Sequence, residues 1–239
     1  MTALDSRFTL PLYSLAEAAH YLGVPTSTFS TWARGYERRP PGRRVVRGAS
    51  IVTAFPAPRS GDACVPFIGL TEGLVLAAIR KTGVPLQRIR PALDALKNEF
   101  GLEHVLASRR LYTDGADVLF DISERTKQVA DADQARRLIV ARNNQYVFNE
   151  VIDSYLRRIE YGSDDYATKV SLPAYAATRI VVDPQRGFGH PIFAKSGARV
   201  EDALSLFRAG ESLETVAAEF GVPIEDVEEA LRVETRAAA

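Results

Sequence analysis

The chain has 239 residues, of which 46% are hydrophobic and 25% are charged. These values are typical of soluble globular proteins and exclude a disordered, collagen-like or coiled-coil chain. Thirty Lys and Arg residues balance thirty Asp and Glu residues, and this net charge of zero argues against a nucleic-acid binder, whose surface is usually basic.

The zero hides a charge gradient along the chain. Residues 1–60 carry eight basic and three acidic residues, residues 61–179 carry sixteen of each, and residues 180–239 carry six basic and eleven acidic residues. Opposite charges at the two ends are typical of two interaction surfaces with different partners. We therefore predict three domains with these boundaries.

The cysteine count and hydropathy predict a cytoplasmic protein. Cys64 is the only cysteine, so no intramolecular disulfide can form, which fits a reducing compartment. No stretch approaches the ~20 apolar residues of a membrane-spanning helix, and the N-terminus lacks the apolar run of a signal peptide. We expect no membrane partner.

The tripeptide Gly-Val-Pro occurs three times, at residues 23–25, 83–85 and 221–223. Apolar residues recur at helical spacing before the first and third copies, and the second copy is a weaker match. A glycine can end one helix in the left-handed conformation, and a proline fits the first turn of the next. Each copy therefore predicts a helix-turn-helix unit, the first with its second helix at about 25–34.

The remaining elements follow in chain order. Val45-Val46 and Ile51-Val52-Thr53 predict a small hairpin, or wing, behind the second helix, and residues 56–66 read as a loop. Helices are expected at 71–82, 86–100 and 146–160, a hairpin at 109–121 around Asp114-Gly115, strands near 168–172 and 179–182, and helices around 201–209, 213–220 and 224–236. Residues 123–145 carry no clear pattern.

This order predicts a mainly α fold with small β-hairpins. It begins with a winged helix-turn-helix, continues through a mixed α+β middle region, and ends in a three-helix domain that itself resembles a helix-turn-helix.

The second helix of the first unit has the features of a DNA reader. Phe29, Trp32 and Ala33 are expected to pack inward. The outward side chains can bond to base edges or phosphates, and the arginines that follow can neutralise phosphates. The predicted DNA-binding residues are Thr26, Ser27, Ser30, Thr31, Arg34, Arg38, Arg39, Arg43, Arg44 and Arg47. The alternative is a solvated basic loop beside a structural helix pair.

The pattern Ser-Leu-x-x-x-Ala-x-x-Leu-Gly-Val-Pro-x-x-Thr-x-x-x-Trp from Ser14 to Trp32 resembles the MerR-like winged helix-turn-helix. The resemblance covers about a quarter of the chain. A two-fold dimer is expected, because paired half-sites on DNA match a two-fold protein.

The last helix of the chain carries the opposite charge. Its acidic residues would repel phosphates, so it is expected to contact protein, either a basic partner or a second copy. The predicted partner-binding residues are Glu225, Asp226, Glu228 and Glu229; Glu234 lies on the same helix. The alternative is a solvated acidic face.

A connected pattern runs through the last sixty residues: Ile180-Val181-Val182-Asp183-Pro184, then Phe188-Gly189-His190-Pro191-Ile192, then Arg199-Val200 before a helix. It resembles the small domain of unknown function found in VapB-type antitoxins. The turn Gly197-Ala198-Arg199 departs from the usual Gly-Thr-Arg. The resemblance implies an antitoxin that neutralises a VapC-type PIN-domain ribonuclease and represses its own operon through operator double-stranded DNA.

The sequence offers no catalytic site. His20, His104 and His190 are far apart, and none has metal-ligand spacing with another His or Cys. No phosphate-binding glycine loop is present. We expect no enzyme activity, no metal and no cofactor. Two alternatives stay open: a MerR-like regulator whose middle region senses a ligand, and an enzyme or scaffold that uses the winged helix only structurally.

Overall fold

The computed structural model describes residues 5–39, 45–83, 85–101, 103–111, 154–175 and 178–237. They fall into two compact units. The first combines the N-terminal residues up to Ser30, residues 54–67 and the chain from Thr168 onward, and the second combines Thr31–Thr53 with Ile68–Ala167. Each unit thus brings together distant segments, and the division into domains 1–60, 61–179 and 180–239 stays a prediction.

The first unit begins with α1 (Ser6–Thr9), which the sequence did not predict, and α2 (Leu15–Leu22). Ser14 caps α2: its Oγ accepts a hydrogen bond from the Glu17 amide at 3.2 Å, and the Glu17 carboxylate accepts one from the Ser14 amide at 2.8 Å. Gly23 ends α2 with φ of 65°, and α3 (Thr26–Arg34) follows and runs on into the second unit. The predicted helix-turn-helix is confirmed.

Residues 54–67 join the N-terminus through backbone pairing. The amides of Leu12 and Tyr13 donate to the Val65 carbonyl, and the amides of Cys64 and Val65 donate to the Tyr13 carbonyl, at 2.8–3.1 Å. Residues 56–66 form the predicted loop. This pairing holds the helix-turn-helix against a segment fifty residues further along the chain.

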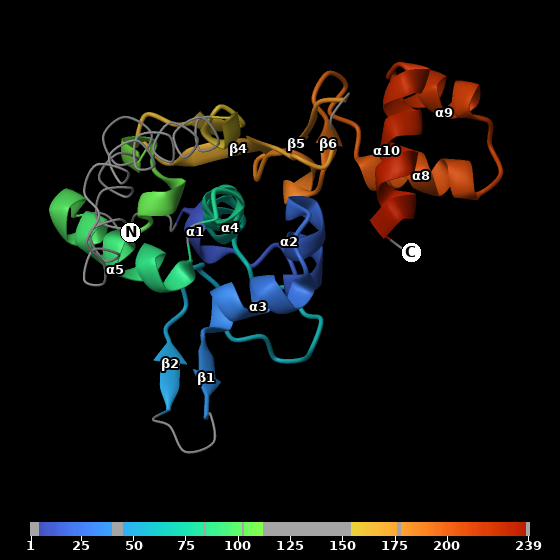
Figure 1. Cartoon of the computed structure of the whole chain (residues 1–239). Coiled ribbons are helices and arrows are strands. Elements are labelled where there is room, and N and C mark those ends of the chain that lie inside the picture. The colour runs from blue at the N-terminus through green and yellow to red at the C-terminus, as the bar shows by residue number, and fades with distance from the viewer. Residues whose placement is uncertain are drawn as a thin grey trace, which may run out of the picture. The chain divides into compact units, whose positions relative to one another are not determined.

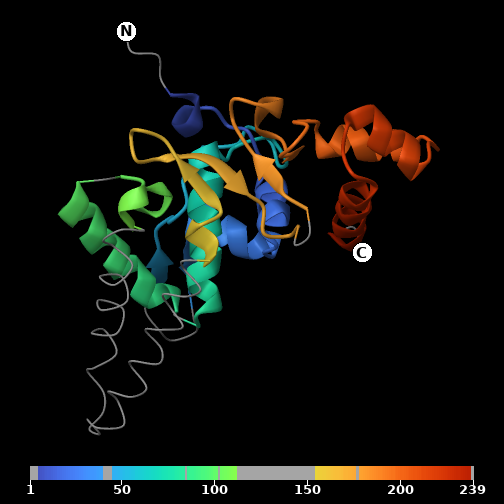
Figure 2. The ribbon, with the colours of Figure 1, turned by 90° about the horizontal axis from the view of Figure 1, so that it is seen from above.

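The rest of the first unit contains an antiparallel sheet and a helix cluster. The sheet pairs β4 (Ala167–Ser171) with β5 (Ile180–Val182), and β5 with β6 (Ile192–Phe193). A short 3-10 turn, Gly187–Gly189, precedes β6. The helices α8 (Val200–Arg208), α9 (Leu213–Phe220) and α10 (Ile224–Ala237) pack against one another, as Figures 1 and 2 show in red.

Helix α9 and helix α10 repeat the construction of α2 and α3. Ser212 caps α9 by accepting from the Thr215 amide at 3.2 Å, and Gly221 ends it with φ of 61°. The middle copy of the tripeptide also joins two helices, with Gly83 at φ of 83°. All three Gly-Val-Pro units are therefore turns between helices, as predicted.

The second unit is built around α4 (Phe67–Lys81), whose residues 68–79 are all buried. It also contains α5 (Leu86–Phe100), the 3-10 turn η1 (Val105–Ala107) and β3 (Ile159–Tyr161). The predicted helices at 71–82 and 86–100 are confirmed, the first starting four residues earlier than predicted.

Two predictions in the second unit are wrong. The wing pairs β1 (Tyr36–Arg38) with β2 (Val46–Gly48) and does not use residues 51–53, because the amides of Ile51 and Val52 both donate to the Trp32 carbonyl, at 2.8 and 3.1 Å. The helix predicted at 146–160 does not include Ile159, which lies in β3. The rest of that helix before residue 154, and the predicted hairpin beyond residue 111, lie outside the described residues.

Within the described residues the chain is mainly helical with small antiparallel sheets, which confirms the predicted fold class. In the same part of the chain, no helix combines the length and the apolar character needed to cross a membrane.

Candidate DNA-binding surface

Helix α3 separates an inner face from an outer face as the sequence predicted. Phe29, Trp32 and Ala33 are buried, at 0%, 1% and 6% exposure. Of the polar residues predicted to face outward, Thr26, Ser27 and Arg34 are exposed and Ser30 and Thr31 are half-buried. Because three hydrogen-bonding groups lie on the outer face, the helix can present polar atoms to the edges of bases.

The wing carries its own ion-pair cluster. Glu37 of β1 lies opposite Arg47 of β2 in the strand register, and its carboxylate accepts hydrogen bonds from the Nε atoms of Arg39 and Arg47, both at 2.8 Å. About three quarters of each of these arginine side chains is exposed. Exposed pairs of this kind are weak, so both guanidinium groups can exchange Glu37 for a phosphate.

The sequence predicts three further arginines in the DNA contact. Arg38 lies in β1, and Arg43 and Arg44 lie outside the described residues. Their role in DNA binding stays a prediction.

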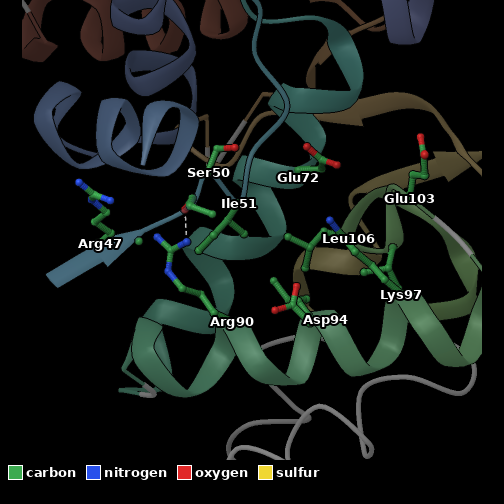
Figure 3. Close-up of a pocket in the computed structure, with 13 residues that line it drawn as sticks. Arg47, Ser50, Ile51, Glu72, Arg90, Asp94, Lys97, Glu103 and Leu106 are labelled. Atoms are coloured by element: carbon green, nitrogen blue, oxygen red, sulfur yellow. Dashed lines mark hydrogen bonds between the residues drawn. The ribbon is translucent and has the colours of Figure 1, made fainter. Parts of the chain in front are cut away.

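A cavity of about 240 Å³ lies beside the wing. Figure 3 shows it between the residues that follow β2 and the helix α5, which contributes Arg90, Asp94 and Lys97. Arg90 donates to the carbonyl of Ala49 and stacks on the Tyr36 ring, with 5.6 Å from its guanidinium carbon to the ring centroid. One arginine of α5 thus contacts the end of the wing where β1 begins and β2 ends.

Glu72 is a buried charged residue that the sequence analysis did not predict to be part of a site. It is 3% exposed in the middle of α4, and it accepts hydrogen bonds from the Thr53 amide at 2.6 Å and from His104 Nδ1 at 2.9 Å. The signal was present in the sequence, because Glu72 is the one charged residue in the apolar run 67–79. A buried carboxylate requires such partners.

The acidic residues of α10 do not form one solvent-exposed face. Glu225 and Glu228 are exposed, whereas Asp226 accepts a hydrogen bond from Thr178 Oγ1 at 2.8 Å, and Glu229 is buried and paired with Arg232. Two of the four predicted partner-binding residues are therefore already engaged within the chain.

Glu234 of α10 contacts the helix-turn-helix. Both of its carboxylate oxygens lie 3.2 Å from His20 Nε2 on α2, and Tyr175 Oη donates to Oε1 at 2.8 Å. The bond with Glu234 raises the pKa of His20, and the bond with His20 lowers the pKa of Glu234. The acidic helix and the first helix of the DNA reader are thus joined by a charged hydrogen bond.

The described residues include no group of three or more His, Cys, Asp or Glu side chains that could hold a metal ion. Cys64 is buried.

Two family descriptions match parts of the chain. Residues 11–93 match a family described as "Putative DNA-binding HTH domain", and residues 180–232 match a "Protein of unknown function (DUF433)". The first covers α2, α3 and the wing, and the second covers β5, β6 and α8–α9 with most of α10.

Relatives match the chain over nearly its whole length. A Mycobacterium tuberculosis protein named "Putative antitoxin VapB45" is 47% identical over 229 residues, 95% of each chain. The uncharacterized protein Rv2308 of the same organism is 27% identical over 96% of this chain and 92% of its own. The crystal structure of Rv2018 from M. tuberculosis superposes with a TM-score of 0.73 at 37% identity, over 94% of this chain and 99% of that one.

Proposed function

The chain belongs to the family of the M. tuberculosis protein named "Putative antitoxin VapB45", and from this premise we propose that it is the antitoxin of a VapC-type PIN-domain ribonuclease and represses its own operon. A protein of this family, with a DNA-binding helix-turn-helix domain, acts by binding and is not an enzyme. The observation that supports DNA binding is the arrangement of α3, whose apolar side is buried while Thr26, Ser27 and Arg34 are exposed, and a basic wing follows this helix in the sequence.

The proposed reader uses α3 for bases and the wing for phosphates. Arg34 reaches a guanine edge in the major groove, and Arg39 and Arg47 leave Glu37 to pair with the backbone. The protein acts as a homodimer on a two-fold operator, in the cytoplasm where the operator lies.

The DNA-binding proposal is tested by gel shift on the DNA upstream of the gene. Arg34→Ala is expected to weaken binding about 10-fold and to relax base preference, since one bidentate base contact contributes roughly 1–3 kcal/mol. Arg47→Ala is expected to weaken binding to all sequences and to reduce the salt slope by about 1. Arg59→Ala, at an exposed arginine of the loop 56–66, is the control. Equal affinity for the wild type and Arg34→Ala would show that α3 does not read DNA.

The antitoxin proposal is tested with the neighbouring open reading frame. If that frame encodes a PIN-domain protein, the two chains are expected to co-purify, and co-expression is expected to relieve the growth arrest that the neighbour causes alone. A neighbour that is harmless by itself, or that does not bind this chain, contradicts the proposal.

A ligand-responsive regulator is the second candidate function, and the cavity beside the wing favours it. Its volume of about 240 Å³ and its charged lining, which includes Arg47, Asp94 and Lys97, suit a small polar molecule. A small molecule that changes operator affinity, with no toxic neighbour, would support this candidate over the antitoxin.

A further inference from the structure

Phe188 is an aromatic residue that the fold holds in solvent. Its side chain is 83% exposed, compared with 50% for Leu10, the next most exposed large hydrophobic side chain among the described residues. It lies in the 3-10 turn Gly187–Gly189 before β6, within the segment 180–232 and outside the DNA-binding segment 11–93. Phe188 belongs to neither the helix-turn-helix nor the acidic helix α10, so the functions proposed for these two elements do not explain its exposure.

The backbone of Phe188 is strained. It adopts φ 54° and ψ 30°, in the left-handed region that L-residues with bulky side chains avoid. Asp165 is the other non-glycine residue with positive φ in the described part of the chain, and a short polar side chain tolerates that conformation better. A glycine at position 188 would remove both the strain and the exposed ring. Phe188 therefore opposes folding stability in two ways, which is typical of a residue kept for binding.

The turn is tightly packed and hydrogen-bonded in spite of this strain. A Cβ atom at Gly187 would lie 2.7 Å from Ile192 Cγ2, and one at Gly189 would lie 2.9 Å from Leu12 Cδ1. The Tyr13 hydroxyl, 1% exposed, donates to the Gly189 carbonyl at 2.8 Å, and burial raises the pKa of this phenol, so it stays a donor. Two backbone hydrogen bonds close the turn. The Gly189 amide donates to the Arg186 carbonyl at 3.1 Å, and the His190 amide donates to the Gly187 carbonyl at 3.0 Å.

An exposed aromatic side chain on an already ordered backbone loses little backbone freedom when it enters a pocket, and aromatic residues often dominate the energy of an interface. Nucleic acid is a poor partner for this ring, because residues 180–239 carry eleven acidic and six basic residues and would repel phosphates. The remaining partner is a protein surface with an apolar pocket.

We propose that Phe188 is the anchor by which this protein binds its toxin, its ring entering an apolar pocket on the toxin surface. The assignment of the partner rests on the proposed antitoxin function. The anchoring role rests on the exposure and strained backbone of Phe188 and on the close packing of its turn.

The test measures the affinity of the full chain for the purified PIN-domain protein by calorimetry. Phe188→Gly is expected to weaken binding about 30-fold, as for other truncated hot spots, while the melting temperature of the free chain stays equal or rises because the strain is relieved. Phe188→Asn, which also tolerates positive φ, is expected to do the same. Phe55→Ala, at another exposed aromatic residue of the first unit, is expected to leave toxin affinity unchanged.

Three results would overturn the inference. Wild-type toxin affinity in Phe188→Gly would exclude the anchor while leaving the antitoxin function intact. A lower melting temperature in both the Gly and Asn variants would show that Phe188 is a structural residue. Conversion of a dimer to a monomer, with toxin affinity unchanged, would assign the ring to self-association. If the wild-type chain itself does not bind the toxin, the proposed function fails, and the assignment of the partner fails with it.

Discussion

At the scale of single residues, Glu72 illustrates how a charge is retained inside an apolar helix. The Thr53 amide and His104 both donate to its carboxylate, so the charge is compensated at a site that is 3% exposed. The same contacts connect α4 to the residues after the wing and to the segment before η1. A residue of this kind contributes to stability through the partners that its loss would leave unpaired.

Glu72→Ala is therefore expected to lower the free energy of unfolding by about 1–3 kcal/mol, because it removes the acceptor of the half-buried Thr53 amide and the carboxylate that bonds to His104. Urea denaturation measures the change. Glu103→Ala, at an exposed neighbour of His104, is the control and is expected to change stability by less than about 0.5 kcal/mol. If Glu72→Ala lowers the free energy of unfolding no more than the control does, water replaces the carboxylate as hydrogen-bond acceptor without loss of stability.

Residue periodicity predicted which side chains of α3 are buried and missed the contacts of Glu72 and Glu234. Phe29, Trp32 and Ala33 were identified correctly because helical spacing by itself separates the two faces. The partners of Glu72 lie 19 and 32 positions away, and His20 lies 214 positions from Glu234. The spacing of residues within one helix carries no information about contacts with residues so far away in the sequence.

At the scale of elements, the wing is a basic hairpin restrained by one acidic residue. Glu37 holds Arg39 and Arg47 on the exposed surface of the hairpin. If these arginines bind phosphates, Glu37 competes with DNA for them, and it lowers both the affinity and the number of counterions released.

Glu37→Gln is expected to raise operator affinity several-fold at low salt and to make the slope of log K against log salt steeper by about 1 to 2. Fluorescence anisotropy over a salt series measures both quantities. Glu211→Gln changes the net charge by the same amount at an exposed position between α8 and α9, and it is expected to leave the slope unchanged. If the slope of log K against log salt is the same for both variants, the wing does not contact DNA.

The wing also shows which part of an element the sequence could predict. The presence of a hairpin after α3 was predicted from β-branched residues, but the pairing partner was wrong, since β2 pairs with Tyr36–Arg38. Short strands have little periodicity of their own, and the choice of partner depends on which backbone amides are already used. Here Ile51 and Val52 donate to Trp32.

At the scale of the whole molecule, His20 and Glu234 link the first helix of the DNA reader to the last helix of the chain. The pKa of His20 is raised above 6.5, so its contribution to stability is complete below that pH and is lost as the pH rises through the higher folded-state pKa. The pKa of Glu234 is lowered below 4.5, so its contribution is present above that pH and is lost as the pH falls through the folded-state value. The pair stabilises the fold most between these two limits.

His20→Ala is expected to destabilise the chain more at about pH 5.5 than at about pH 8.5, by less than about 1 kcal/mol because the pair is partly exposed. Thermal unfolding at the two pH values measures this difference. The double variant His20→Ala with Glu234→Gln is expected to lose less than the sum of the single variants. Additive losses and a difference that does not depend on pH would show that the contact contributes nothing.

Local sequence determined the three Gly-Val-Pro turns, the helices that flank them, and the inner and outer faces of α3, because each depends on backbone preferences or spacing within a short stretch of chain. The charge gradient follows from composition alone. Tertiary structure alone decided the pairing of the wing, the burial of Glu229, the link from Glu234 to His20, and the strained exposure of Phe188. The link from Glu234 to His20 and the bond from Tyr13 to the Phe188 turn join segments far apart in the sequence, and the pairing of the wing depends on the amides that Trp32 already binds.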